Sequence, residues 1–157
     1  MTTIEQVRTF NRTVTQGVGA LNDRFLARDR SLGESRVLWE IGAAGEAGVE
    51  VRALRARLDL DSGYLSRLIG SLVAAGLVEV GPGQSDRRVR TARLTRRGVR
   101  ERRVLDERSD QLAASLLAPL TPSQQTQLVE AMGTVRRLLT ASLVKLCLLY
   151  TSDAADE

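Results

Sequence analysis

The side chains of this sequence that could do chemistry are arginines, and they are concentrated in one segment. Residues 87–108 contain ten Arg and three acidic residues, a local net charge of +7, whereas all other residues together carry 13 basic and 16 acidic groups. Arginine pairs well with phosphate, so a basic segment on a slightly acidic body is typical of a protein that binds a polyanion. A solvated, arginine-rich helix face explains the same composition. The sequence leaves both interpretations open.

Catalytic and metal-binding residue types are scarce. The chain has no His and a single cysteine, Cys147. These numbers exclude a Cys/His zinc site, a Ser-His triad and an internal disulfide framework. No pair of carboxylates is spaced for acid–base catalysis. We therefore expect no enzymatic activity, no metal and no cofactor.

Length and hydropathy limit the architecture. At 157 residues, 43% of them hydrophobic, the chain fits one compact domain of ordinary soluble type. No apolar run approaches the ~20 residues that a membrane span needs, and the start MTTIEQVRTF lacks the pattern of a secretory signal. The lone thiol agrees with a reducing compartment. These features predict a cytoplasmic protein with no membrane partner.

Two short helices separated by a turn are predicted in the middle third. Val51, Leu54 and Leu58 mark the first helix, the stretch LDLDSG forms the turn, and Asp61 or Ser62 caps the second helix. Gly76 is positioned to end it. The buried face of the second helix is expected to comprise Leu65, Leu68, Ile69, Leu72 and Val73. Its exposed face then presents Ser62, Gly63, Tyr64, Ser66 and Arg67. This arrangement is typical of a helix-turn-helix.

A β-hairpin with a basic tip is predicted next. The run LVEV alternates like a strand, GPGQSDRR supplies turn residues, and VRTARLT suits the returning strand. A helix-turn-helix followed directly by such a hairpin is a winged helix. In that arrangement the second helix enters the major groove of DNA, and the wing reaches phosphates or the minor groove.

The same residues resemble the DNA-binding core of the MarR family of bacterial transcription regulators. The resemblance is carried by SGYLSRLIGSLVAAGLVEV followed by SDRRVRTARLTRRG. It covers Ile4 to about Leu143 in layout, and it is specific at the level of motif from Leu60 to Gly98. Several spaced elements agree in order, so the signal is strong.

The resemblance implies roles for individual residues. Asp86 and Arg88 match the Asp-x-Arg pair of the wing, in which the carboxylate orients the arginine toward the minor groove. Arg87 and Arg90 correspond to phosphate contacts. The positions that face the major groove or its flanking backbone are Ser62, Gly63, Tyr64, Ser66 and Arg67. Three structural alternatives remain open, namely a simple Asp86–Arg88 salt bridge, packing of Tyr64 against the turn, and a hydrogen bond from Ser66 back to its own helix.

Long amphipathic helices are expected on both sides of this core. One apolar stripe runs from Ile4 to Phe25, a second helix is expected over about 33–44, a third from Arg96 to about Leu117, and a last helix starts with Thr121 as cap and Pro122 in first position. By resemblance, the first helix and the last two interlock with a second subunit. The dimerisation residues so predicted are Ile4, Val7, Val14, Leu128, Val135 and Leu139. An intramolecular bundle is the alternative.

The predicted fold class is mainly α, a winged helix-turn-helix domain with a two-stranded wing flanked by N- and C-terminal dimerisation helices. We expect a MarR-like domain over 1–145, with dimerisation helices at 1–30 and 100–145 and the winged core at 33–98. Residues 146–157 are expected to form an irregular tail that resembles a translated sequencing adapter. If so, the native protein continues past about residue 145, and an alternative is the regulatory N-terminal half of a truncated MarR–GNAT N-acetyltransferase fusion.

The resemblance implies a homodimeric transcription regulator that binds double-stranded DNA at an inverted-repeat operator. It also implies a small-molecule effector bound between the dimerisation helices and the winged core, where Arg36 and Trp39 are the nearest candidates. A different class of function, in which the basic segment binds an acidic protein, is disfavoured by the order of the elements. The operator sequence, the effector and the sign of regulation are not encoded in any recognisable pattern.

Overall fold

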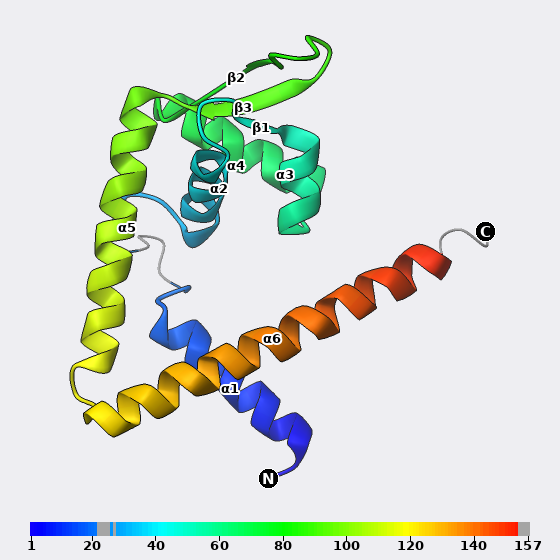
Figure 1. Ribbon diagram of the computed structural model, residues 1–157. Helices are drawn as coiled ribbons and strands as arrows, with labels where there is room; N and C mark the ends of the chain where they lie inside the picture. The colour runs from blue at the N-terminus through cyan, green and yellow to red at the C-terminus, as the bar shows by residue number, and fades with distance from the viewer. Residues whose placement is uncertain (22–25, 27, 154–157) are drawn as a thin grey trace. The chain divides into compact units, whose positions relative to one another are not determined.

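The computed structural model describes residues 1–21, 26 and 28–153, with side chains to Lys145. The described residues form six helices and three short strands, and Figure 1 shows their arrangement within the chain. In chain order they are α1 (Thr3–Gly17), α2 (Leu32–Ala43), β1 (Val49–Glu50), α3 (Val51–Leu58), α4 (Ser62–Ala74), β2 (Val78–Pro82), β3 (Arg90–Leu94), α5 (Arg96–Leu117) and α6 (Pro122–Asp153). Two compact units divide the chain, Met1–Asp110 and Gln111–Glu157. The mainly helical fold class and the winged helix-turn-helix are thereby confirmed.

One hydrophobic core holds α2, α3, α4, the strands and the middle of α5 together. Its buried side chains are Val37, Leu38, Ile41, Val49, Leu54, Leu65, Leu68, Ile69, Leu72, Leu77, Val78, Ala92 and Leu105. Four of the five apolar residues predicted for the buried face of α4 belong to it. The prediction for Val73 was wrong, because this side chain is 43% exposed. Val73 lies at the margin of the apolar stripe, where α4 meets a hollow beside Val80 and Arg90 instead of another layer.

The strands form a three-stranded antiparallel sheet in the order β1-β3-β2. The wing is the β2–β3 hairpin, in which Val78 lies opposite Leu94 and Pro82 opposite Arg90. The short strand β1 pairs with β3 through Val49 and Ala92. Gly48 makes this close approach workable, since it has a φ of +76° and a Cβ there would lie 2.5 Å from the carbonyl oxygen of Ala92.

The first helix is shorter than the sequence pattern predicted. α1 ends at Gly17, whereas the apolar stripe was expected to continue to Phe25, which lies outside the described residues. The stop is a local motif at Gly19, whose φ is +67°. The N–H of Gly19 donates to the carbonyl of Gln16, and that of Ala20 donates to the carbonyl of Thr15, as in a Schellman cap.

A threonine caps the start of each of the last two helices, and the cap at Thr121 agrees with the prediction. Thr95 precedes α5, and its hydroxyl oxygen accepts a hydrogen bond from the N–H of Gly98 at 3.0 Å. Thr121 precedes α6 and accepts from the N–H of Gln124 at 3.3 Å, while the Gln124 side chain accepts from the N–H of Thr121 at 3.0 Å. Helix starts of this kind depend on residues three positions apart, so the sequence displays them directly.

The C-terminal segment differs from the irregular tail predicted to begin at residue 146. Helix α6 continues to Asp153. The sequence from 145 to 153 contains neither Gly nor Pro, so nothing in it breaks a helix that is already formed. No helix in the described part of the chain has the length and hydropathy needed to cross a bilayer.

Candidate nucleic-acid interface

Helix α4 has a defined beginning and end that position its exposed side chains. The Asp61 carboxylate accepts a hydrogen bond from the N–H of Tyr64 at 2.9 Å, which caps the N-terminus as predicted. At the other end Gly76 has a φ of +72°, and the N–H of Leu77 donates to the carbonyl of Leu72 at 3.0 Å. The residues predicted to face DNA, Ser62, Gly63, Tyr64, Ser66 and Arg67, are all exposed on this helix.

The wing is shaped by Asp86. One of its carboxylate oxygens accepts a hydrogen bond from the backbone N–H of Arg88 at 2.9 Å, and its carbonyl accepts from the N–H of Val89 at 3.2 Å. Within the described residues, no ion pair joins Asp86 to the guanidinium of Arg88. Asp86 therefore forms an Asx turn that folds the backbone, and the salt-bridge alternative finds no support. Asp86, Arg87, Arg88 and Arg90 are exposed.

A groove brings three elements together. It has a volume of about 410 Å³ and is bordered by α3, the first turns of α4 and the end of the wing. Its lining residues are Glu50, Val51, Arg52, Arg55, Ser62, Leu65, Ser66, Arg88, Val89 and Arg90. Two serines and two arginines of the predicted set thus meet in one place. Gly63, Tyr64, Arg67, Asp86 and Arg87 do not line it.

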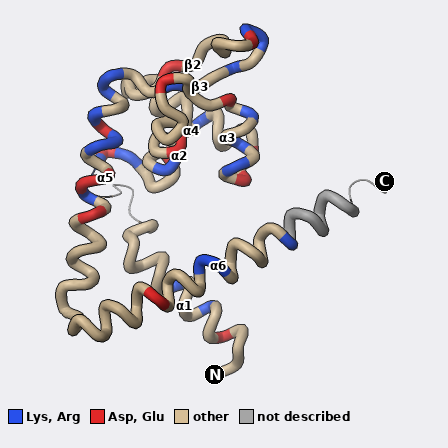
Figure 2. The backbone as a smooth tube through the Cα atoms, viewed as in Figure 1, with Lys and Arg blue, Asp and Glu red and all other residues tan. Residues whose placement is uncertain are grey.

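Helix α3 adds two arginines to this groove, Arg52 and Arg55, which were not predicted from the sequence. Both are exposed, and Arg52 lies 4.0 Å from Glu50 in a solvated ion pair that contributes little stability. The segment VRALRARL could have indicated them, because positions 52 and 55 lie on the same side of a short helix. Figure 2 shows basic positions in blue along α3 and at the wing loop.

The electrostatics of this groove favour an anion. Four arginines face one carboxylate, Glu50, in the same hollow. Arginine remains charged at all ordinary pH values, and its five N–H groups suit phosphate oxygens. The serine hydroxyls add short donors at the start of α4. The arrangement can hold a phosphodiester backbone against the end of a helix, and it contains no nucleophile paired with a base.

Comparison with known proteins agrees with this geometry. A family model described as MarR family matches residues 29–89, which include α2, β1, α3, α4, β2 and the whole wing loop. Residues 29–89, which contain the helix-turn-helix, are thus similar to the MarR family. No match was found among curated proteins.

Solved structures of MarR-type regulators extend the likeness beyond residues 29–89. A mutant of MarR from E. coli in complex with operator DNA is 25% identical, with a TM-score of 0.66 over 84% of this chain and 94% of that chain. FabT from Streptococcus pneumoniae in complex with DNA is 20% identical, with a TM-score of 0.65 over 87% of this chain and 93% of that chain.

A third match concerns a ligand complex. The PcaV transcriptional regulator from Streptomyces coelicolor, in complex with its natural ligand, is 23% identical with a TM-score of 0.64, over 85% of this chain and 91% of that chain. These matches show the MarR-type regulator fold for this chain. They offer no support for the acetyltransferase alternative.

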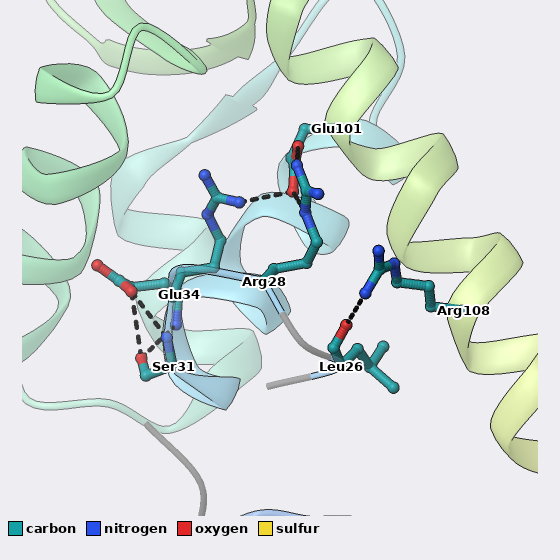
Figure 3. Close-up of polar contacts among 7 residues, drawn as sticks. Leu26, Arg28, Ser31, Glu34, Glu101 and Arg108 are labelled. Carbon is teal, nitrogen blue, oxygen red and sulfur yellow. Dashed lines mark hydrogen bonds and ion pairs between the residues drawn. The ribbon is translucent and has the colours of Figure 1, made fainter. Parts of the chain in front are cut away.

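A carboxylate clamp ties the segment before α2 to α5. Arg28 donates to both carboxylate oxygens of Glu101, at 2.7 and 2.6 Å, and Arg30 donates to one of them at 2.6 Å (Figure 3). The hydrogen bonds from Arg28 lower the pKa of the buried Glu101 carboxyl, and the charge of Arg30 lowers it further. Arg108 adds a hydrogen bond to the carbonyl of Leu26 at 2.7 Å. Sequence analysis counted these residues only as charges.

A second hollow lies beside Trp39, whose indole N–H donates to Asp106 at 3.1 Å. Its volume is about 260 Å³, and its lining residues are Leu26, Leu32, Ser35, Arg36, Trp39, Leu105, Asp106 and Ser109. The hydroxyl of Ser35 is buried and has no hydrogen-bond partner within the described residues. Both residues named as effector candidates from the sequence, Arg36 and Trp39, therefore line one hollow between α2 and α5.

The predicted dimerisation residues lie on α1 and α6. On α1, Ile4, Val7 and Val14 are 71%, 54% and 42% exposed, and no residue of this helix is buried. On α6, Leu139 is 52% exposed, while Leu128 and Val135 are half-buried. Each helix thus presents apolar side chains that its own unit leaves uncovered.

Proposed function

We propose that this protein is a dimeric, sequence-specific transcription regulator that binds double-stranded DNA in the cytoplasm and responds to a small molecule. The observation that carries the proposal is the groove in which Ser62 and Ser66 of α4 meet Arg88 and Arg90 of the wing and Arg52 and Arg55 of α3. A recognition helix flanked by two sets of arginines can enter the major groove while the arginines contact the phosphates on either side of it. The protein acts by occupying DNA, without catalysing a reaction.

The matched structures support a DNA partner. Two of them are DNA complexes of MarR-type proteins with the same fold over more than 80% of this chain. The proposed contacts divide by role. The arginines of the groove hold the backbone and set affinity, whereas the exposed side chains of α4 meet base edges and set sequence preference.

The proposed partner for α1 and α6 is a second copy of this chain. Exposed apolar side chains such as Ile4 and Leu139 are costly to leave in water along a whole helix. A twofold dimer that covers them presents two copies of α4, about 34–36 Å apart for half-sites one helical turn apart. The operator is therefore proposed to be an inverted repeat.

The proposed effector site is the hollow beside Trp39. It combines apolar walls from Leu32 and Leu105 with the unpartnered hydroxyl of Ser35, a pattern suited to a small and mostly apolar ligand. PcaV, with the same fold, was solved with its natural ligand. Because Trp39 is the only tryptophan of the chain, its fluorescence reports occupancy of this hollow directly.

The test is fluorescence anisotropy of the full chain with a pool of genomic DNA fragments, titrated at several salt concentrations and followed by sequencing of the retained DNA. An enriched inverted repeat, with an affinity that falls steeply as salt rises, supports the proposal. Weak binding with no enriched sequence contradicts it. For the effector, small aromatic acids, phenols and amines are each titrated into the protein while Trp39 fluorescence is followed. A compound that binds in the hollow is expected to change both the fluorescence and the affinity for DNA.

A further inference from the structure

The face of α4 directed away from the core is nearly bare. At 100° per residue, the positions opposite the buried Leu65, Leu68 and Leu72 are Gly63, Arg67, Gly70 and Ala74. Arg67 is the one long side chain among them. Ser62 and Ser66 lie to one side of this face, and their short side chains end in a hydroxyl group close to the backbone.

Packing within the fold does not require a glycine at position 70, on the C-terminal side of Arg67. A Cβ at Gly70 would meet nothing within 4 Å, and one at Gly63 would meet only the carboxylate of Asp61 at 3.2 Å. Neither has a positive φ. Glycine inside a helix is less favourable than alanine by about 0.5–1 kcal/mol. Its presence on both sides of Arg67 leaves bare backbone that allows a close approach by another molecule.

Arg67 is held over an aromatic ring. Its guanidinium carbon lies 5.7 Å from the centre of the Tyr64 ring, within the range of a cation–π contact. Within the described part of the chain, Arg67 makes no hydrogen bond or ion pair. The five N–H groups of the guanidinium therefore stay available while the ring limits the directions in which the side chain can point.

Tyr64 in turn is seated on α2. A Cβ at Gly33, in the first turn of α2, would lie 2.9 Å from the Tyr64 hydroxyl oxygen, so the absence of a side chain at Gly33 gives the ring its place. On the same side of α4, the hydroxyl of Ser71 donates to the carboxylate of Glu34, which joins the same two helices. The ring that supports Arg67 is thus fixed by packing between α2 and α4.

We propose that Arg67 recognises a guanine in each half-site, and that Tyr64, placed against Gly33, is the residue that positions it. This inference rests on the proposed DNA-binding function, and it adds which base is recognised and which residue positions Arg67. Guanine offers two acceptors, N7 and O6, at a spacing that an arginine fork matches in the major groove. A guanidinium that is already restrained by a ring loses less conformational freedom on binding than a free one.

The test uses the full chain and a pool of duplex DNA with a randomised centre. Wild type is expected to enrich an inverted repeat that contains a guanine in each half. Arg67→Ala is expected to lose preference at that guanine, with a loss of about 5- to 150-fold in discrimination against the other bases. Arg100→Ala, which removes an exposed arginine on α5, is the matched control and keeps the wild-type preference.

A second set of variants tests Tyr64. Tyr64→Phe keeps the ring and should keep the guanine preference, whereas Tyr64→Ala should weaken it. Gly33→Ala should also weaken it, because the new methyl group displaces the Tyr64 hydroxyl. The double variant Gly33→Ala with Tyr64→Phe removes the clash and should restore the preference. Thermal melting shows whether each variant is still folded. If Tyr64 had only a structural role, its substitution would weaken binding to all DNA sequences equally and leave the base preference unchanged.

The outcomes separate this inference from the proposed function. A wild-type protein that enriches no sequence overturns both. A wild type that enriches a repeat, with base preferences that Arg67→Ala leaves unchanged, overturns the role of Arg67 alone. An unaltered guanine preference in Gly33→Ala and Tyr64→Ala overturns the positioning role of Tyr64.

Discussion

Asp86 holds Arg88 through the backbone, because its carboxylate accepts the Arg88 N–H at 2.9 Å and forms no ion pair with the guanidinium within the described residues. The guanidinium of Arg88 is therefore free to meet an external anion in the groove that it lines. Asp86 thus determines the conformation of the turn by accepting a hydrogen bond, and its negative charge is less important.

This relationship predicts different results for two substitutions of Asp86. Asp86→Asn retains an oxygen that accepts the Arg88 N–H, so it should bind DNA about as well as wild type. Asp86→Ala removes the acceptor and should weaken binding roughly 2- to 10-fold, the equivalent of one hydrogen bond. Anisotropy titrations at fixed salt measure both. Tighter binding by Asp86→Ala would show that the carboxylate matters only as a repulsive charge.

Removal of the wing arginine should change the salt dependence of binding. Arg88→Ala is expected to weaken DNA binding and to reduce the slope of log affinity against log salt by about one contact. Titrations at four or more salt concentrations give the slope. Unchanged affinity and slope would remove Arg88 from the interface.

The arginines of α3 provide a prediction that the sequence pattern did not. Arg55→Ala should weaken binding uniformly across DNA sequences and lower the salt slope by about one, because a phosphate contact carries no base information. Base preferences measured by selection should stay the same as in wild type. A changed base preference would mean that α3 contacts base edges.

Stability should depend on pH through Glu101. Its pKa is lowered in the folded state by the hydrogen bonds from Arg28, so the stabilisation is complete above the unfolded-state pKa of about 4.3 and is lost as the pH falls through the lower folded value. Glu101→Gln should lower the free energy of unfolding at pH 7 by about 1.5–3 kcal/mol.

Urea denaturation of wild type and Glu101→Gln at pH 7 and at successively lower pH measures both effects. The difference in stability between the two proteins should shrink as the pH falls. A constant difference across that range would show that the clamp acts by packing and not by charge. Glu107→Gln, on an exposed position of the same helix, is the control.

Association of two copies should depend on α6. Leu139→Glu places a charge on a side chain that is 52% exposed in the single chain, so it should leave the fold intact while preventing a partner from covering this face. Sedimentation velocity is expected to show a dimer for wild type and a monomer for the variant. A variant that still sediments as a dimer would place the interface elsewhere.

The sequence by itself was sufficient for the elements that local contacts specify. The cap of α4 at Asp61, its stop at Gly76 and the start of α6 at Thr121 each depend on hydrogen bonds between residues a few positions apart. A periodic apolar pattern also identified the four core residues of α4, which are Leu65, Leu68, Ile69 and Leu72. The early end of α1 at Gly17, set by the cap at Gly19, is equally local, and it was missed because the apolar stripe continued beyond it.

Only the tertiary structure decided which charges serve the fold and which remain available. Glu101 meets Arg28 across 73 positions of sequence, and the groove gathers Arg52 and Arg88 from separate elements. Val73 belonged to the buried stripe by periodicity, yet no layer covers it. Such contacts depend on the path of the whole chain, because packing brings together side chains that are far apart in the sequence. The spacing of residues along the sequence does not reveal that path.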